Sequence, residues 1–435
     1  MTGQQTLIAR GVLGVFAGAL SIAACSNAYL RRLPNLRFDR FAVATFLVTR
    51  LGFFGLIFFV LRIAPRGDIP AYYWSEANSV LRGLLPYRDF VSSYAPLHSY
   101  IDAAAIRIWH TPLAIILLAI LAETVLLPLW FRFGRNLLSE TEIRTATLLY
   151  LTSTVSLQFV AIDGQDTVVV AVFLALSLFF LTRQKELLSG ASTGAAVASI
   201  KFLPLLFAPA FFLSLPKRWR WTLGLAIPIA AVYGTSVAMG LPILTPLKQE
   251  GNIKGAGNLP FLIESILGIT LPSRLWDLLL LAVLAVIFLL IARAAHASTP
   301  VGRLRVITFS LAALTLALLL FSKKSWPPYL MLALFPICLL IEVRRLQLIG
   351  FALVGVVAVV EHSYWASILS QVTALQFHQG LLAGHSNCFV FLGLEVAMLA
   401  GYTWLLTNAL RRIGAAPGFV LETTPERQGD LIGRV

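Results

Sequence analysis

The segment LAIILLAILAETVLLPLW, residues 113–130, contains a single charged side chain, Glu123. An apolar run of this length is what an α-helix needs to cross the hydrocarbon core of a bilayer. Similar runs recur along the chain, which is 58% hydrophobic and 12% charged, with a mean hydropathy of +0.83. Ordinary soluble domains have about 25% charged residues. The sequence therefore predicts a polytopic membrane protein.

The runs are continuous, and this distinguishes between the two structures that can span a bilayer. Backbone polar groups find no water in hydrocarbon, so they must be satisfied within helices or within a closed barrel. Barrel strands alternate apolar and polar residues, and these runs do not. We expect an all-α fold of about 12–13 transmembrane helices, forming one domain over residues 1–410. A polar cytoplasmic tail without packed structure is expected at 411–435.

The net charge of +14 is concentrated in short connectors between the apolar runs. The basic clusters are Arg31–Arg40, Arg132–Arg144, Lys217–Arg220, Arg303–Arg305, Arg344–Arg345 and Arg411–Arg412. This is the positive-inside distribution, so the charge sets orientation and does not indicate a nucleic-acid partner. It predicts outer loops at about 63–110, 241–275 and 362–386. The three cysteines lack the spacing of a zinc site. The sequence contains no GxxxxGK[ST] nucleotide-binding loop, so an ATP-driven pump is not indicated.

The first outer loop contains the longest polar segment of the chain, residues 67–96. Residues 71–82 have helical spacing, and the flanking Pro70 and Gly83 suit a helix start and end, so we expect a short interfacial helix there. Asp68 stands just before it, where two roles are open. It can be the N-cap, as Asp often is, a general base at the mouth of a cavity, or both.

Three charged residues, Arg50, Glu123 and Lys201, fall within apolar runs. A charge there costs roughly 2.5–3.5 kcal/mol on insertion scales, so each must face a partner or a wet cavity. Arg50 and Glu123 are interpreted as a helix-to-helix pair. Lys201 lies in the segment 190–215, which begins and ends at cytoplasmic charge. We therefore expect two short helices broken near Lys201, which would reach a cavity.

Other polar residues leave two interpretations open. Asp163 and Asp166 flank Gly164-Gln165 in a predicted tight turn; Asp163 is interpreted as a turn former, whereas Asp166 is either a turn former or a site residue. Lys323 and Lys324 lie on the outer side, where lysines either snorkel to headgroups or bind phosphate. His362, His378 and His385 lack ligand spacing and are expected at the surface.

Several of these pieces resemble one family. Asp68, the tyrosine-rich helix, Leu81–Phe90 and Tyr94–Leu97 resemble the first outer loop of bacterial C-type membrane glycosyltransferases of family 87, the DUF2029-like mannosyltransferases that use polyprenol-phosphate-mannose. Weaker similarities are Gly164-Gln165, Lys201 with Pro204, Glu264-Ser265 and Pro328-Tyr329, so that the resemblance covers residues 65–345. Ser92-Ser93 departs from the acidic-aromatic step that many members carry.

The resemblance implies C-type glycosyltransferase architecture and an inverting transfer of a sugar, mannose first, at the outer face of the bacterial cytoplasmic membrane. Asp68 would be the base that acts on the acceptor hydroxyl. The implied partners are a polyprenyl-phosphate sugar donor, a lipid or glycan acceptor and membrane lipids. No cofactor is called for, and a need for a divalent metal stays open.

The expected substrate-binding residues come from the loop, the resemblance and the outer-face cations. They are Glu76, Arg82, Tyr87, Arg88, Asp89, Tyr94, Gln165, Asp166, Lys201, Glu264, Lys323, Lys324 and Tyr329. A transporter or flippase is the alternative, in which Arg50, Glu123 and Lys201 would mark a path. A transporter should have two related halves, each with a broken helix pair. The sequence indicates a single broken pair, near Lys201. A structural membrane protein is the third interpretation, and it would need no carboxylate-rich loop.

Overall fold

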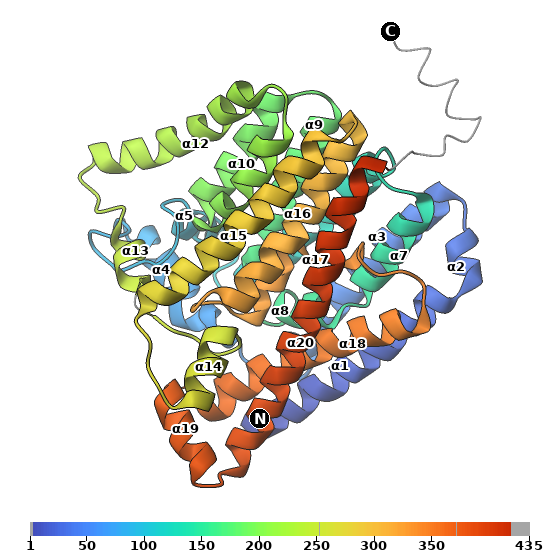
Figure 1. The fold of residues 1–435 in the computed structure, drawn as a ribbon. Coiled ribbons are helices and arrows are strands. Elements are labelled where there is room, and N and C mark those ends of the chain that lie inside the picture. The colour runs from blue at the N-terminus through green and yellow to red at the C-terminus, as the bar shows by residue number, and fades with distance from the viewer. Residues whose placement is uncertain (1–2, 252, 371, 419–435) are drawn as a thin grey trace.

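The computed structural model describes residues 3–251, 253–370 and 372–418, and this part of the chain is helical without a β-strand (Figure 1). Eight helices in it are long and apolar enough to cross a membrane. They are α1 (Gly3–Ser26), α3 (Asn35–Gly55), α6 (Leu113–Gly134), α12 (Arg218–Ala238), α15 (Ser273–His296), α16 (Pro300–Phe321), α18 (Arg345–Tyr364) and α20 (Ser386–Ala415). The expected all-α polytopic fold is confirmed.

The number of long spans is smaller than the expected 12–13, because several apolar segments form short, broken helices. These are α7 (Glu140–Leu151), α8 (Thr154–Phe159), α9 (Thr167–Thr182), α10 (Glu186–Ser199), α11 (Ala208–Ser214) and α17 (Leu334–Cys338), with 3-10 turns at Leu203–Phe207 and Pro327–Ala333. Irregular backbone is tolerated at membrane depth where it is buried in protein. Most side chains of these segments are buried, so hydropathy alone cannot distinguish them from spans.

The expected break near Lys201 is confirmed. Helix α10 ends at Ser199, and the 3-10 turn Leu203–Phe207, with Pro204 in its first turn, leads into α11. Helix α10 lies directly against α12: a Cβ built on Gly190 would stand 1.9 Å from the carbonyl oxygen of Trp221. Small residues allow such close backbone approach between membrane helices. This contact fixes the helix that delivers Lys201.

The core is built around α16, which lies in the middle of the bundle (Figure 1). In its most hydrophobic window 89% of the residues are buried, compared with 22% in α12 and in α15. A helix that is apolar all round belongs inside a bundle. The peripheral helices instead expose apolar side chains, as lipid-facing helices do.

Short helices gather at one side of the bundle in Figure 1. They include α4 (Trp74–Leu81) and α5 (His98–Ile108) from the first loop, α13 (Thr245–Glu250) and α14 (Leu259–Leu267) from the second, and α19 (Ala374–Leu382). The helix predicted at 71–82 is present, as a π-helical turn at Ile69–Tyr73 followed by α4. The sequence did not predict α5.

The C-terminal helix extends beyond the predicted end of the domain at residue 410. Helix α20 continues to Ala415, and Arg412 forms ion pairs with Glu142 (3.5 Å) and Glu342 (3.4 Å). These contacts keep the start of the expected tail helical. Residues 419–435 of the expected tail lie outside the described residues.

Candidate functional site

A cavity of about 820 Å³ opens beside the first loop. Its walls come from α1, the first loop, the turn before α9, the break after α10, the turn before the 3-10 segment Pro327–Ala333, and the end of α18. The charged, polar and aromatic side chains that line it are Thr6, Arg10, Arg66, Asp68, Tyr72, Ser93, Tyr94, Asp163, Gln165, Lys201, Lys324, Trp326, Tyr329, His362, Ser363, Trp365, Ser367 and Ser370. The cavity thus gathers segments from most of the chain.

Six of the residues expected from the sequence meet in this cavity. They are Asp68, Tyr94, Gln165, Lys201, Lys324 and Tyr329. Local sequence does not bring them together, because they come from four separate segments. Their convergence is the main agreement between the sequence-based site and the structure.

Asp68 faces the cavity and does not cap a helix. It occupies the N-cap position of the turn Ile69–Tyr73, but its side chain makes no capping hydrogen bond. Its Oδ2 instead accepts a hydrogen bond of 3.1 Å from Nε2 of Gln165. The N-cap interpretation is therefore wrong. Gln165 orients a carboxylate that a ligand in the cavity can reach.

Lys201 stands between two tyrosine rings at the cavity wall. Its Nζ lies 4.7 Å from the ring centre of Tyr94 and 5.8 Å from that of Tyr329, both within cation–π range. It also lies 3.7 Å from Oδ1 of Asp166. The side chain is 19% exposed, so its charge faces the cavity while its stem is packed.

The turn at residues 163–166 supplies a partner for each of the two charged groups, Asp68 and Lys201. Gly164 has a φ of +63°, and a Cβ there would meet side-chain atoms of Ile69 and Ile116 at 2.9 Å. Only glycine fits that conformation and space. The turn directs Gln165 to Asp68 and Asp166 to Lys201.

Asp163, expected only as a turn former, holds α1 against the cavity. Both of its carboxylate oxygens accept hydrogen bonds from the Arg10 guanidinium, one at 2.8 Å from Nη1 and a shorter one from Nη2. Arg10 also reaches Ser363 of α18 at 3.5 Å. Forked pairs of this kind fix geometry as well as charge. No site role for α1 was predicted from the sequence.

Cations outnumber carboxylates around the cavity. Arg10, Arg66, Lys201 and Lys324 line it, against Asp68 and Asp163. Arg66 also donates to the Thr6 hydroxyl of α1 at 2.7 Å. A concave wall with excess positive charge attracts anionic ligands, phosphates among them. No group of three or more His, Cys, Asp or Glu in the described residues could hold a metal ion.

Asp166 lies behind Lys201, outside the cavity lining, and is 7% exposed. Burial alone would raise its pKa, but Lys201 and then His98 outweigh burial, so the pKa lies below its usual value. His98, the first residue of α5, lies with Nε2 3.2 Å from Oδ2 of Asp166. His98 was not predicted from the sequence. Its available signal was the spacing of four to Asp102 on α5.

Glu76 and Tyr87 shape the first loop from outside the cavity. The Glu76 carboxylate accepts hydrogen bonds from the hydroxyls of Ser92 (2.8 Å) and Ser99 (2.7 Å). Burial raises the pKa of Glu76, and the two serine bonds oppose that rise. The Tyr87 hydroxyl donates to the main-chain oxygen of Tyr94. Both residues thus hold the loop segment that contains Tyr94.

The remaining expected residues lie elsewhere. Arg88 and Asp89 pair with each other at 2.9 Å on the surface, and Arg82 borders a separate shallow pocket beside Trp74 and His110. Glu264 is buried and accepts from Lys254 (2.6 Å) and the Trp276 indole (2.8 Å). Lys323 pairs with Asp277 at 2.6 Å, so the two adjacent lysines diverge. None of these residues lines the cavity.

The expectations for His362 and for the pair Arg50 and Glu123 need correction. His362 was expected at the surface, but it lines the cavity, with its ring edge-on to Phe159 at 5.5 Å. Arg50 and Glu123 are both fully buried, yet they are joined through side chains between them rather than directly. Ser156 contacts both, and Tyr150 donates to Glu123 at 2.6 Å.

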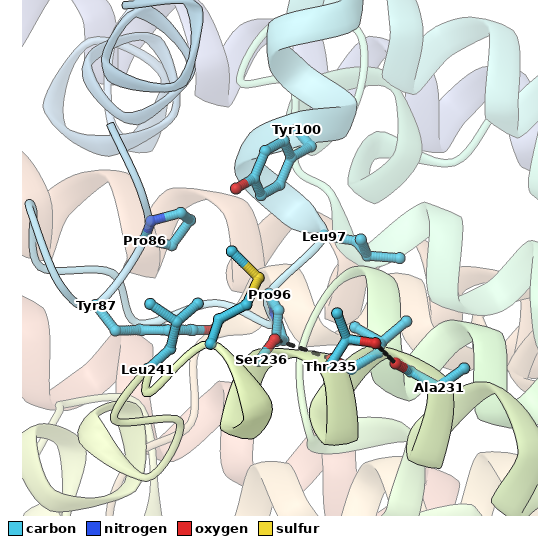
Figure 2. Close-up of a pocket in the computed structure, with 11 residues that line it drawn as sticks. Pro86, Tyr87, Pro96, Leu97, Tyr100, Ala231, Thr235, Ser236 and Leu241 are labelled. Atoms are coloured by element: carbon cyan, nitrogen blue, oxygen red, sulfur yellow. Dashed lines mark hydrogen bonds between the residues drawn. The ribbon is translucent and has the colours of Figure 1, made fainter. Parts of the chain in front are cut away.

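An apolar groove of about 310 Å³ runs between the first loop and α12 (Figure 2). Tyr87, Leu97 and Tyr100 line one side, and Thr235 and Ser236 of α12 lie on the other. The two hydroxyls donate back to α12 carbonyl oxygens at 2.6 and 2.9 Å, so they are already satisfied. The chain segment 94–97 separates this groove from the cavity.

Comparison of the chain with models of protein families, with curated proteins and with solved structures found no match. The site is therefore interpreted from its own geometry and from the resemblance in the first loop.

Proposed function

We propose that the protein is a membrane glycosyltransferase that moves a sugar, mannose on the resemblance, from a polyprenyl-phosphate donor to a hydroxyl of a lipid or glycan acceptor. One observation carries the proposal: a carboxylate, Asp68, and an ammonium group, Lys201, share one cavity and are oriented by the same turn. Base and cation are the two groups that such a transfer needs.

The reaction follows from those two groups. Asp68 takes the proton of the acceptor hydroxyl, and the oxygen attacks the anomeric carbon of the donor sugar. The bond from that carbon to the phosphate oxygen breaks, and polyprenyl phosphate leaves with the electron pair. Its added negative charge is stabilised by Lys201 and Lys324, which line the same cavity. A single displacement inverts the anomeric centre.

The membrane setting fits an amphipathic donor. The cavity has excess positive charge and lies in a protein with eight helices apolar enough to cross a membrane, two of which, α1 and α18, contribute to its lining, so a phosphate and its isoprenoid chain would each find suitable surroundings. The positive-inside distribution supports an active site on the outer face of a bacterial cytoplasmic membrane.

The transporter alternative loses much of its support in this arrangement. It relied on Arg50, Glu123 and Lys201 marking one path. Arg50 and Glu123 are 0% exposed and bond to backbone and side chains around a helix break, whereas only Lys201 lines the cavity.

Replacing the proposed base tests the function. Asp68→Asn, purified into lipid nanodiscs, is offered polyprenyl-phosphate mannose and glycolipid acceptors, and transfer is followed by mass spectrometry of the lipids. We expect the rate to fall by about 10²–10⁴-fold, the usual contribution of a general base.

Asp89→Asn is the comparator, because Asp89 is a carboxylate of the same loop outside the cavity. It should transfer sugar at a rate close to that of the parent protein. Unchanged transfer by a correctly folded Asp68→Asn variant would refute the mechanism.

A further inference from the structure

Behind Lys201 lies a row of buried charged groups that the mechanism above does not use. Asp166 follows Lys201, His98 follows Asp166, and Asp102 follows His98. Asp166, His98 and Asp102 are 7%, 2% and 5% exposed, respectively. Charged groups are rarely buried to this degree unless they pair with one another or serve a site.

The contact distances define the order of the row. Lys201 Nζ lies 3.7 Å from Asp166 Oδ1, His98 Nε2 lies 3.2 Å from Asp166 Oδ2, and His98 Nδ1 lies 3.7 Å from Asp102 Oδ2. Each oxygen of Asp166 thus has its own cation. The carboxylate links the cavity lysine to the histidine behind it.

Aromatic rings hold the row in place. The His98 ring stacks on Tyr94, with centroids 4.2 Å apart and an interplanar angle of 16°. Tyr94 is also the ring on which Lys201 rests. Tyr73 packs edge-on against both Tyr94 (5.2 Å) and His98 (5.0 Å). His98 therefore contacts both supports of Lys201, its carboxylate and its aromatic platform.

We propose that His98, oriented by Asp102, is a positioning residue that holds Asp166 and Tyr94 and thereby places the Lys201 ammonium for the phosphate of a lipid phosphate. This inference rests on the proposed function, in which Lys201 meets the donor phosphate. His98 itself does not line the cavity and touches no substrate.

The charge states support this arrangement. Burial alone lowers the pKa of His98, but Asp102 and Asp166 outweigh burial and raise it above its usual value. The pKa of Asp166 is lowered by Lys201 and then by His98, the two groups that face its carboxylate oxygens. Burial raises the pKa of Asp102 to about 7. Glu76 is the further acid that acts on His98.

The ordinary alternative is that the row only stabilises the fold. The contacts argue for more than stability, because the row ends at the cavity. Lys201 lines the cavity, and Asp166 and Tyr94 both contact its ammonium group.

Lipid binding separates the two explanations. His98→Gln keeps an N–H donor near the position of Nε2 and removes the charge. Dissociation constants of the purified protein in nanodiscs are measured for a polyprenyl phosphate and for the uncharged polyprenol of the same chain length. We expect a weakening of about tenfold for the phosphate, equal to about 1.4 kcal/mol, and no change for the alcohol.

A double-mutant cycle with Lys201→Gln then tests the link. In the Lys201→Gln background, His98→Gln should have no further effect on phosphate binding, because the group that it positions is gone. Asp102→Asn is the second variant, with a smaller weakening in the same direction. His378→Gln, a half-buried histidine bonded to the Ser265 carbonyl at 2.9 Å, is the control and should bind both lipids normally.

Equal weakening for the phosphate and the alcohol would overturn the inference, as would additive effects in the cycle. If phosphate binding changes as expected but no sugar is transferred from any donor, the transferase proposal fails and the positioning role of His98 remains.

Discussion

Two of the buried networks of charged residues, one around Arg50 and one around Asp166, differ in whether they reach a cavity. Around Arg50, the guanidinium donates to the carbonyl oxygens of Tyr150 (3.2 Å) and Leu151 (2.6 Å) and to the Ser156 hydroxyl. Around Asp166, the carboxylate oxygens lie 3.2 Å from Nε2 of His98 and 3.7 Å from Nζ of Lys201. The first network is enclosed, and the second ends at a cavity.

The position of each network explains this difference. Helix α7 ends at Leu151 and α8 begins at Thr154, so the last α7 carbonyls lose their helical partners. Arg50 supplies the missing donors, which gives it a structural role. Lys201 also lies at a helix break, but its ammonium group lines the cavity while it contacts Asp166 and Tyr94. The two networks therefore differ in whether a ligand in the cavity can reach them.

The largest effect that would test this comparison is on stability. Arg50→Met removes the donors of the α7 break and leaves Glu123 as a buried carboxylate without its cation. Breaking a buried pair in this way costs about 3–5 kcal/mol. Unfolding of the detergent-solubilised protein, followed by heat or denaturant, measures the loss.

Arg40→Met is the matched control, because Arg40 is exposed on the same helix. It should change stability by less than about 0.5 kcal/mol. If Arg50→Met were as stable as this control, the enclosed network would not be structural.

A smaller effect, on binding, is expected at Lys201. Lys201→Gln should raise the KM for the lipid-phosphate donor by an amount equal to about 2 kcal/mol, the usual value of a hydrogen bond to a charged group. Stability should change little, since Asp166 keeps His98 as a partner. Steady-state kinetics beside thermal unfolding measures both quantities.

Lys248→Gln, an exposed lysine of α13, is the matched control and should keep the parent KM. An unfolding loss for Lys201→Gln as large as that of Arg50→Met, with KM unchanged, would remove the distinction between the two networks.

The smallest expected effect depends on pH. The folded protein keeps the Asp102 proton up to a pKa of about 7, whereas the unfolded chain releases it near the ordinary value of 3.8. Between these values the unfolded state binds fewer protons, so stability falls as pH rises. Asp102→Asn removes this decline and should be the more stable protein above pH 7.

Unfolding free energies measured from pH 4 to 8 test this sign. Parallel pH profiles of the parent and the Asn variant would show that Asp102 is ionised throughout and paired with His98. If Asp102→Asn is more stable than the parent above pH 7 and yet binds the lipid phosphate more weakly, the role of Asp102 in positioning is distinct from its effect on stability.

The sequence predicted the features that have local signals. Continuous apolar runs predict helices, Pro204 and flanking charges predict the break near Lys201, and Pro70 and Gly83 predict the short helix of the first loop. The number of spans was overestimated because buried broken helices are as apolar as lipid-facing ones.

The candidate site was only partly predictable. Motif resemblance selected Asp68, Gln165, Lys201 and Tyr329, which the structure brings into one cavity. Arg10 and His98 were missed because their roles depend on contacts with distant residues. Neither contact leaves a pattern in the local sequence. Asp68 lines the cavity, as a site residue should, but its predicted capping bond is absent and its carboxylate accepts from Gln165 instead.

The ion pair between Arg10 and Asp163 also has a consequence for biosynthesis. The two residues are 153 positions apart, so Arg10 leaves the ribosome long before its partner exists. At about 5–20 residues per second, the wait is on the order of 10–30 s. During that time Arg10, near the N-terminal end of α1, does not have Asp163 as its partner. The wall that it forms can close only after α9 begins to emerge, which makes completion of the cavity a late event in the assembly of the chain.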